Sequence, residues 1–212
     1  MKRFNLLVLE AAVLFGAVNL NASSIVLSAQ PDNTTVGLNG TLKVSFNIQG
    51  LEGNAPNGPS LGGFDFFFGY DSSILANPTV SFGDPILGDQ LALTVPSITC
   101  VGTACGAPTN QPLELFEVSL DPVAALEASQ HSAFTLATIT FKSVGLGTSS
   151  LTLSNVTLSD ENGGLLSDQI VNSSVNVSSR AATPEPRIGI LLPLGAGLAC
   201  LLFRRRWTSA HS

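Results

Sequence analysis

The chain has 212 residues, of which 11% are charged, with 9 basic and 15 acidic side chains. Soluble domains usually carry about a quarter charged residues, so this composition indicates membrane segments or an exported surface rich in uncharged polar groups. Between Ile25 and Ser179 only Lys43 and Lys142 are basic, against thirteen acidic residues. Such a segment cannot neutralise phosphates, which excludes a nucleic-acid-binding protein.

Residues 1–24 have the pattern of a secretory signal peptide, which is helical in the membrane. Lys2 and Arg3 precede an apolar stretch, residues 6–20, that is too short to span a bilayer and is followed by small residues. Glu10 fits this stretch poorly, because a carboxylate is costly in a membrane. An uncleaved anchor or a buried helix is the alternative, but the pattern favours export.

The other end of the chain has three segments of different chemistry. They are a linker over residues 180–187, an apolar segment over 188–203 and a basic tail over 204–212. As a helix the apolar segment would span roughly 24 Å, somewhat less than the ~30 Å hydrocarbon core of a bilayer. Arg204, Arg205 and Arg206 follow it directly and act as a stop-transfer signal. The sequence therefore predicts a single transmembrane helix with a cytoplasmic tail.

The linker contains Pro184, Glu185 and Pro186, and both prolines favour extended backbone around the glutamate. This motif, the apolar helix and the arginine cluster together resemble the PEP-CTERM sorting signal of Gram-negative bacteria. The resemblance implies that an exosortase, a membrane-embedded cysteine transpeptidase, cleaves near the motif and passes the protein to the cell surface or the extracellular matrix. A permanent membrane anchor with a proline-containing stalk is the alternative.

Residues 25–179 have the length of about one domain. Apolar and polar residues alternate through most of this segment, which predicts β-strands with one buried face, and only residues 123–128 show a weak helical pattern. The predicted buried residues are Leu42, Val44, Phe46 and Ile48 in one strand and Phe64, Phe66, Phe68 and Tyr70 in another, and a further strand presents Val171, Ser173, Val175 and Val177 on one face.

The parity of the alternation changes within residues 134–141 and again within residues 151–158. A parity change inside a strand indicates a β-bulge or a strand that crosses between sheets. The spacing of turn signals predicts an antiparallel sandwich of about 8–10 short strands.

Residues 61–75, 136–142 and 147–153 resemble a cohesin domain. The resemblance implies an all-β fold, an antiparallel jelly-roll-like β-sandwich, in the same broad superfamily as some cellulose-binding modules. Cohesins of cellulosomes bind dockerin modules, whereas exported cohesin-like domains outside cellulosomes need not do so.

Few side chains of residues 25–179 are candidates for a disulfide, a metal site or a catalytic site. Cys100 and Cys105 flank four residues of an exported loop, which predicts a disulfide, because a metal site would need histidine or further cysteine partners.

His131 is the domain's single histidine, so a Ser-His-Asp triad has no support, and no nucleophile elbow or phosphate loop occurs. Two acidic pairs could in principle act as glycosidase carboxylates: Glu114 with Glu117, and Asp160 with Glu161. The simpler interpretation is that these acids lie in solvated loops. The sequence predicts no enzyme.

Two further candidates concern binding. Asp160, Glu161 and Asn162 offer oxygen ligands for Ca²⁺, but the EF-hand spacing is broken, so an Asx turn is favoured and no cofactor or metal is expected. Phe67 points to the face opposite Phe66, where it either stacks on a sugar or is covered by a loop.

Together these patterns predict an exported, non-catalytic surface or extracellular-matrix protein of a Gram-negative bacterium. Its β-sandwich is expected to act as a binding or adhesion module. The expected partners are an exosortase-type enzyme, the membrane through the C-terminal helix, and an extracellular polysaccharide or surface protein. The alternative function is a carbohydrate-binding module for an extracellular polysaccharide.

Overall fold

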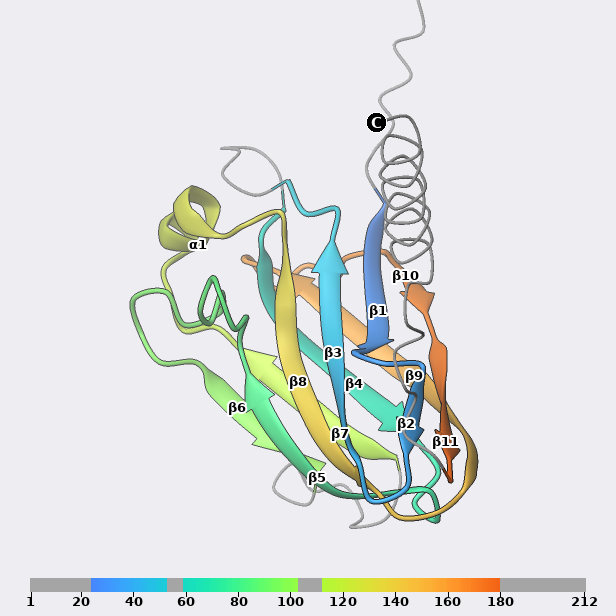
Figure 1. The fold of residues 1–212 in the computed structure, drawn as a ribbon. Helices are drawn as coiled ribbons and strands as arrows, with labels where there is room; N and C mark the ends of the chain where they lie inside the picture. Colours follow the sequence, from blue (N-terminus) through green and yellow to red (C-terminus); the bar gives the residue numbers. More distant parts are fainter. Residues whose placement is uncertain (1–23, 53–58, 103–111, 180–212) are drawn as a thin grey trace, which may run out of the picture.

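The computed structural model describes residues 24–52, 59–102 and 112–179, which form two β-sheets packed face to face (Figure 1). The first sheet has five strands in the order β10-β1-β3-β8-β5, and the second has six in the order β2-β11-β9-β4-β7-β6. The strands of the first sheet are β1 (Ile25–Pro31), β3 (Thr41–Gln49), β5 (Leu75–Phe82), β8 (Ala133–Ser143) and β10 (Asp168–Val171). Those of the second sheet are β2 (Thr35–Gly37), β4 (Leu61–Gly69), β6 (Ile98–Val101), β7 (Leu113–Val118), β9 (Gly147–Asp160) and β11 (Ser173–Ser178).

The predicted β-sandwich is confirmed, with a helix α1 (Val123–Ser129) where the weak helical pattern lies. Two pairings differ from the antiparallel prediction, because β10 runs parallel to β1 and β2 runs parallel to β11. Both pairings lie at sheet edges, where a short strand adds to a neighbour without a hairpin connecting the two. These short edge strands also raise the number of described strands to eleven, above the 8–10 expected.

The core lies between the sheets and consists of the side chains that the alternation predicts to be buried. The ring of Phe46, from the first sheet, lies 5.0 Å from that of Phe66 and 4.9 Å from that of Phe68, both from the second sheet. Tyr70 packs against this core at its margin. Aromatic pairs at such distances stabilise a core beyond their buried area, so these rings join the two layers. The confirmed core positions are Leu42, Val44, Phe46, Ile48, Phe64, Phe66 and Phe68, each at most 2% exposed.

The first parity change is a β-bulge in β8. Phe46 of β3 lies opposite Ala137, and the next residue, Asn47, lies opposite Thr135. Leu136 is therefore the extra residue, and it is buried together with Ala137. Because of this bulge, the apolar residues before and after the parity change face the same core, and the strand does not cross between sheets.

The second parity change, in β9, is also a bulge. Phe67 of β4 lies opposite Ser154, whereas Asp65 lies opposite Thr157, so β9 has one residue more than β4 between these pairs. Asn155 lies in this interval with a φ of 49°, in the left-handed region that asparagine tolerates better than most residues.

The prediction of one strand over residues 171–177 is wrong. The chain leaves the first sheet after Val171 and enters the second at Ser173, so Val171 is 48% exposed while Val175 and Val177 are buried. Asn172 lies at this crossing, and its Oδ1 accepts a hydrogen bond from the backbone N–H of Leu153 at 2.8 Å. The side-chain alternation continues through the crossing, which is why it concealed the change of sheet.

The predicted signal peptide, the linker with its Pro-Glu-Pro motif, the transmembrane segment and the basic tail lie outside the described residues, apart from Ser24. Within the three described stretches, no helix combines the length and the apolar character needed to cross a membrane. The sorting signal therefore stays a prediction from sequence.

Candidate functional site

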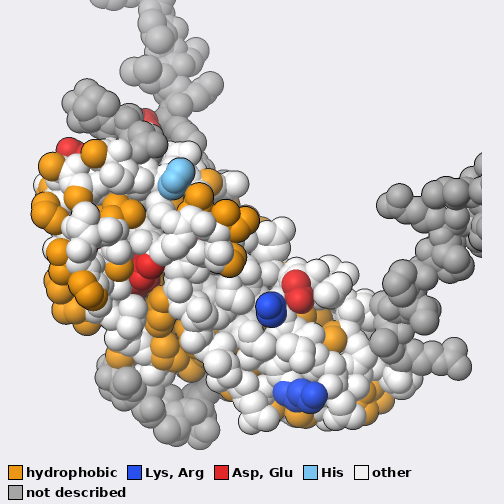
Figure 2. Space-filling model, turned by 60° about the vertical axis from the view of Figure 1, so that its left-hand side comes forward, with side chains coloured by type: hydrophobic (Ala, Val, Ile, Leu, Met, Phe, Trp, Pro, Cys, Tyr) orange, Lys and Arg blue, Asp and Glu red, His pale blue; other side chains and the backbone are white. Residues whose placement is uncertain are grey.

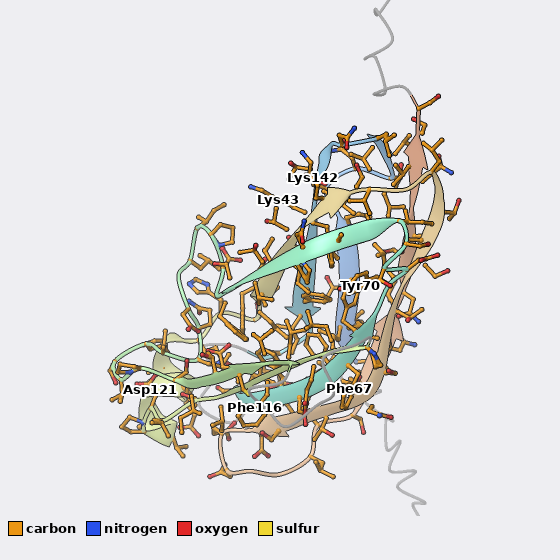
Figure 3. All side chains as sticks on the ribbon, turned by 90° about the horizontal axis from the view of Figure 1, so that it is seen from below. Lys43, Phe67, Tyr70, Phe116, Asp121 and Lys142 are labelled. Carbon is orange, nitrogen blue, oxygen red and sulfur yellow. The ribbon has the colours of Figure 1, made fainter. Side chains whose placement is uncertain are left out.

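Phe67 lies on the outer face of the second sheet. Its neighbours Phe66 and Phe68 are fully buried, whereas Phe67 is half-buried and points away from the core. Figure 3 shows Phe67 next to Phe116 on the outer side of this sheet, away from the core.

Four residues of β4 and β7 form what we call the outer patch: Asp65, Phe67, Glu114 and Phe116. In the antiparallel register Asp65 lies opposite Phe116, and Phe67 lies opposite Glu114. Aromatic and acidic side chains therefore alternate in both directions across the patch, and all four are half-buried. The alternation in the sequence predicts that Phe67 points outward, but it does not indicate that Asp65 and Phe116 are its neighbours.

Both carboxylates of the outer patch lie in surroundings that disfavour their ionised form. Burial raises the pKa of Asp65, and its Oδ1 is buried without a hydrogen-bond partner in the described part of the chain. The pKa of Glu114 is also raised, first by burial and then by the charge of Asp65. Since both shifts disfavour the ionised form, a positively charged group placed over the patch would stabilise both carboxylates.

A hollow of about 90 Å³ adjoins the patch beside Asp65 and Phe116. It lies where Gly63 contributes no side chain, and a Cβ at this glycine would lie 3.0 Å from the carbonyl oxygen of Glu117. A Cβ here would be tight against β7, which favours glycine, and the same glycine leaves a recess that one partner side chain can enter.

A larger groove of about 440 Å³ lies at the other end of β4. Its hydroxyl groups come from successive outward positions of β9, while the ring of Tyr70 is stacked on Phe68 at 5.9 Å and contacts Phe141 at 4.7 Å. The groove thus offers mainly hydroxyl groups and the edge of one aromatic ring. It is lined by Gly69, Tyr70, Asp71, Pro112, Thr148, Ser150 and Thr152.

Glu114 and Glu117, one of the two acidic pairs considered for catalysis, do not converge. Glu114 and Glu117 lie in strand β7 rather than in a loop and point to opposite faces of the sheet, so the interpretation of Glu117 as a solvated acid is wrong. Glu117 is fully buried, and its Oε1 accepts a hydrogen bond from the hydroxyl of Ser97 at 2.6 Å. Burial, with the nearby charge of Asp89, raises the pKa of Glu117 to about 8.

The oxygens of the weak calcium candidate accept hydrogen bonds from N–H groups. Asp160 Oδ1 accepts the backbone N–H groups of Asn162 at 2.8 Å and Gly164 at 2.7 Å, as in an Asx turn. Glu161 Oε2 accepts the N–H of Ser60 at 2.8 Å. Within the described stretches, no three His, Cys, Asp or Glu side chains lie close enough together to hold a metal ion.

The remaining candidates lie apart from the outer patch. His131 is exposed in the segment between α1 and β8. Cys100 lies in β6 and is disulfide-bonded, whereas Cys105, its predicted partner, lies outside the described residues, so the pairing stays a prediction.

No family model matches the chain, and no curated protein matches its sequence. Solved structures do match. A type II cohesin domain from the cellulosome of Acetivibrio cellulolyticus has a TM-score of 0.54 at 16% identity, over 72% of this chain and 95% of that one. The sixth cohesin of scaffoldin B from the same organism, in complex with a dockerin, has a TM-score of 0.54 at 14% identity, over 73% of this chain and 99% of that one.

A type I cohesin–dockerin complex from Clostridium thermocellum also matches, with a TM-score of 0.52 at 11% identity, over 73% of this chain and 99% of the matched chain. Identities this low show the fold alone. The described part of the chain is therefore a β-sandwich with the fold of cohesin domains, as the resemblance of its sequence implied.

Proposed function

We propose that the β-sandwich is a non-catalytic module that binds a protein partner through the outer patch. The observation that carries the proposal is the alternation of two half-buried aromatic rings with two carboxylates that have no counter-ion within the described residues. Aromatic side chains are enriched at protein interfaces and supply much of their binding energy. A partner complementary to the patch would have apolar surface to cover the two rings and lysine or arginine side chains to pair with the two carboxylates.

The fold is consistent with this proposal. Two of the similar structures are cohesins in complex with dockerins, so sandwiches of this architecture do bind proteins. The sheet also separates Glu114 from Glu117, so this pair does not have the arrangement of a glycosidase, whose two carboxyl groups must flank one bond.

The same proposal includes export and sorting. The signal-peptide pattern, the Pro184-Glu185-Pro186 motif and the arginine cluster support a membrane-anchored precursor that an exosortase-type enzyme releases to the surface or extracellular matrix of a Gram-negative bacterium. At that surface a binding module without catalytic residues would act in adhesion or matrix assembly.

Carbohydrate binding is the second candidate, and the groove beside Tyr70 is the observation that favours it. Its hydroxyl-rich lining suits a polysaccharide chain, although the Tyr70 ring is largely used in core contacts. A protein partner is the better proposal, because the outer patch has two half-buried aromatic rings that point away from the core, and because Asp65 Oδ1 is buried without a hydrogen-bond partner among the described residues.

Photo-cross-linking tests the two candidates. A photoreactive phenylalanine at position 67, introduced in the producing cells, is expected to give adducts whose tryptic digest contains a second peptide joined to position 67, and Phe116→Ala is expected to reduce their yield about tenfold. The matched control places the same group at Ile86, which is 90% exposed in the loop after β5. Adducts that only a glycosidase removes would favour the carbohydrate-binding module, and equal yields at both positions would contradict the outer patch as the site.

Mass spectrometry of the protein extracted from the cell surface tests the sorting proposal. The expected mature chain begins near residues 23–25 and ends around residues 183–186, because both signals are removed during export. Replacing the three arginines by neutral residues should impair sorting, since each is worth roughly 2.5–3.5 kcal/mol against membrane passage. A mature protein that retains residues 188–212 in the presence of an exosortase would establish a permanent anchor instead.

A further inference from the structure

We infer that the partner of the outer patch is a second copy of this chain, which docks through Lys43 and Lys142 on the outer face of its first sheet. The inference rests on the proposed function of the outer patch and names its partner. Figure 3 shows the two lysines on the outer side of one layer and Phe67 with Phe116 on the outer side of the other.

The two lysines are diagonal neighbours on β3 and β8. Thr41 lies opposite Lys142, and Lys43 lies opposite Thr140, in an antiparallel register. Both lysine side chains are exposed. We call these four residues the lysine patch.

The outer patch has the same arrangement with opposite charge. Asp65 and Glu114 are diagonal neighbours on an antiparallel strand pair, with Phe67 and Phe116 at the other two corners. Diagonal neighbours on such pairs lie about 7–8 Å apart, so the spacing of the two carboxylates matches that of the two lysines. Each ammonium group of one copy can therefore reach a carboxylate of the next, while the aromatic rings meet threonine methyl groups and lysine stems.

The distribution of charge limits the alternatives. Lys43 and Lys142 are the only basic residues between Ile25 and Ser179, and the basic side chains of the described residues lie together on one face (Figure 2). Within residues 25–179, a second copy can therefore offer positive charge to the carboxylates of the outer patch only from the face that carries these two lysines. The nearby acid, Asp32, accepts a hydrogen bond from the backbone N–H of Lys43 at 3.1 Å, so one of its oxygens is already used.

The geometry also determines the kind of assembly. The two patches lie on opposite faces of the sandwich, so the contact joins different surfaces of the two copies and leaves one patch free at each end. Contacts of this type do not close into a two-fold dimer but continue head to tail, as open chains or as rings. Exposed ion pairs are individually weak, so we expect chains to form at high local concentration, as on a crowded cell surface, and to dissociate in high salt.

Zero-length cross-linking of the full chain tests the inference. A carbodiimide joins lysines to carboxylates in direct contact, and an equal mixture of ¹⁴N- and ¹⁵N-labelled chains distinguishes contacts between copies from contacts within one. The expected cross-links between copies join Lys43 or Lys142 to Asp65 or Glu114, and 0.5 M salt should abolish them. Cross-links between copies that involve neither lysine would overturn the inference, and so would the absence of any.

Charge-reversal variants give an independent readout. K43E/K142E and D65K/E114K should each lower the yield of these cross-links at least tenfold, whereas their equal mixture should restore it, because each variant supplies the patch that the other lacks. Restoration also shows that both variants fold. E52K/E127K is the matched control, since it changes the net charge as D65K/E114K does but away from both patches, and it should retain the cross-links.

The results separate this inference from the proposed function. If the copies do not cross-link but the photoreactive group at position 67 still joins a different surface protein, the outer patch is a binding site and the second copy is not its partner. If neither experiment gives a protein adduct at the outer patch, both proposals are wrong.

Discussion

Replacing Glu117 by glutamine is expected to raise the free energy of unfolding at pH 9. The free energy of unfolding of the wild-type protein should decrease between pH 6 and pH 9, and most of this decrease should be absent from the variant. Glu117 is fully buried, its Oε2 has no hydrogen-bond partner within the described residues, and burial together with the charge of Asp89 raises its pKa from 4.5 to about 8. Glutamine keeps an oxygen that can accept the hydroxyl of Ser97 and introduces no charge.

The direction follows from proton binding in the two states. The unfolded chain releases the Glu117 proton near pH 4.5, whereas the folded protein holds it up to about pH 8. Between these values the folded state binds one proton more, so stability decreases by about 1.4 kcal/mol per pH unit. The contribution of the protonated carboxyl is complete below pH 4.5 and is lost as the pH rises to about 8, in total on the order of 3–5 kcal/mol.

Urea unfolding followed by circular dichroism at pH 6, 7, 8 and 9 provides the measurement. Glu114→Gln is the matched control, because Glu114 lies on the same strand but on the outer face, and the decrease above pH 6 should persist in this variant. A wild-type stability that does not change between pH 6 and pH 8, or a Glu117→Gln protein less stable than wild type at pH 9, would contradict a raised pKa of Glu117 in the fold.

Phe66→Ala is expected to lower the free energy of unfolding by about 3–5 kcal/mol. Phe66 is fully buried, and its ring lies 5.0 Å from that of Phe46 in the opposite sheet and 5.4 Å from that of Phe64. Alanine would remove the contacts that join the layers and leave a cavity that rigid strands cannot close.

The neighbouring residue provides the control. Phe67→Ala makes the same chemical change one position along β4 but on the outer face, and it should cost less than about 1 kcal/mol. Urea unfolding of both variants at pH 6 compares the two effects. Equal losses would contradict the alternation of the faces of β4. If Phe67→Ala loses little stability but no longer forms carbodiimide cross-links between copies, Phe67 is a binding residue rather than a core residue.

Local pattern was sufficient for much of the fold. A period of two places successive side chains on opposite faces, so the burial of Phe64, Phe66 and Phe68 and the outward position of Phe67 could be predicted without knowing any strand partner. The two parity changes predicted irregular strands for the same reason, and the structure shows that both are bulges.

The candidate site could be predicted only in part. Nothing in the sequence around Phe67 indicates that Glu114 lies opposite it, because the two residues come together only through the register of β4 with β7. Glu117 was misjudged for a related reason. Charged residues are rarely buried, and its position in β7 next to buried Leu115 was evident only once the strand had been placed in the sheet.

The sequence by itself determined the alternating strands, the single core and the acidic surface with its two lysines, and it predicts export signals in residues 1–24 and 180–212. These features depend on local period and composition, which a single chain displays directly. Tertiary structure alone decided the crossing at Asn172, the parallel edge strands, and the registers that form the outer patch and the lysine patch. Each of these depends on pairing between distant segments, and a strand's own pattern does not specify which partner it meets or in which register.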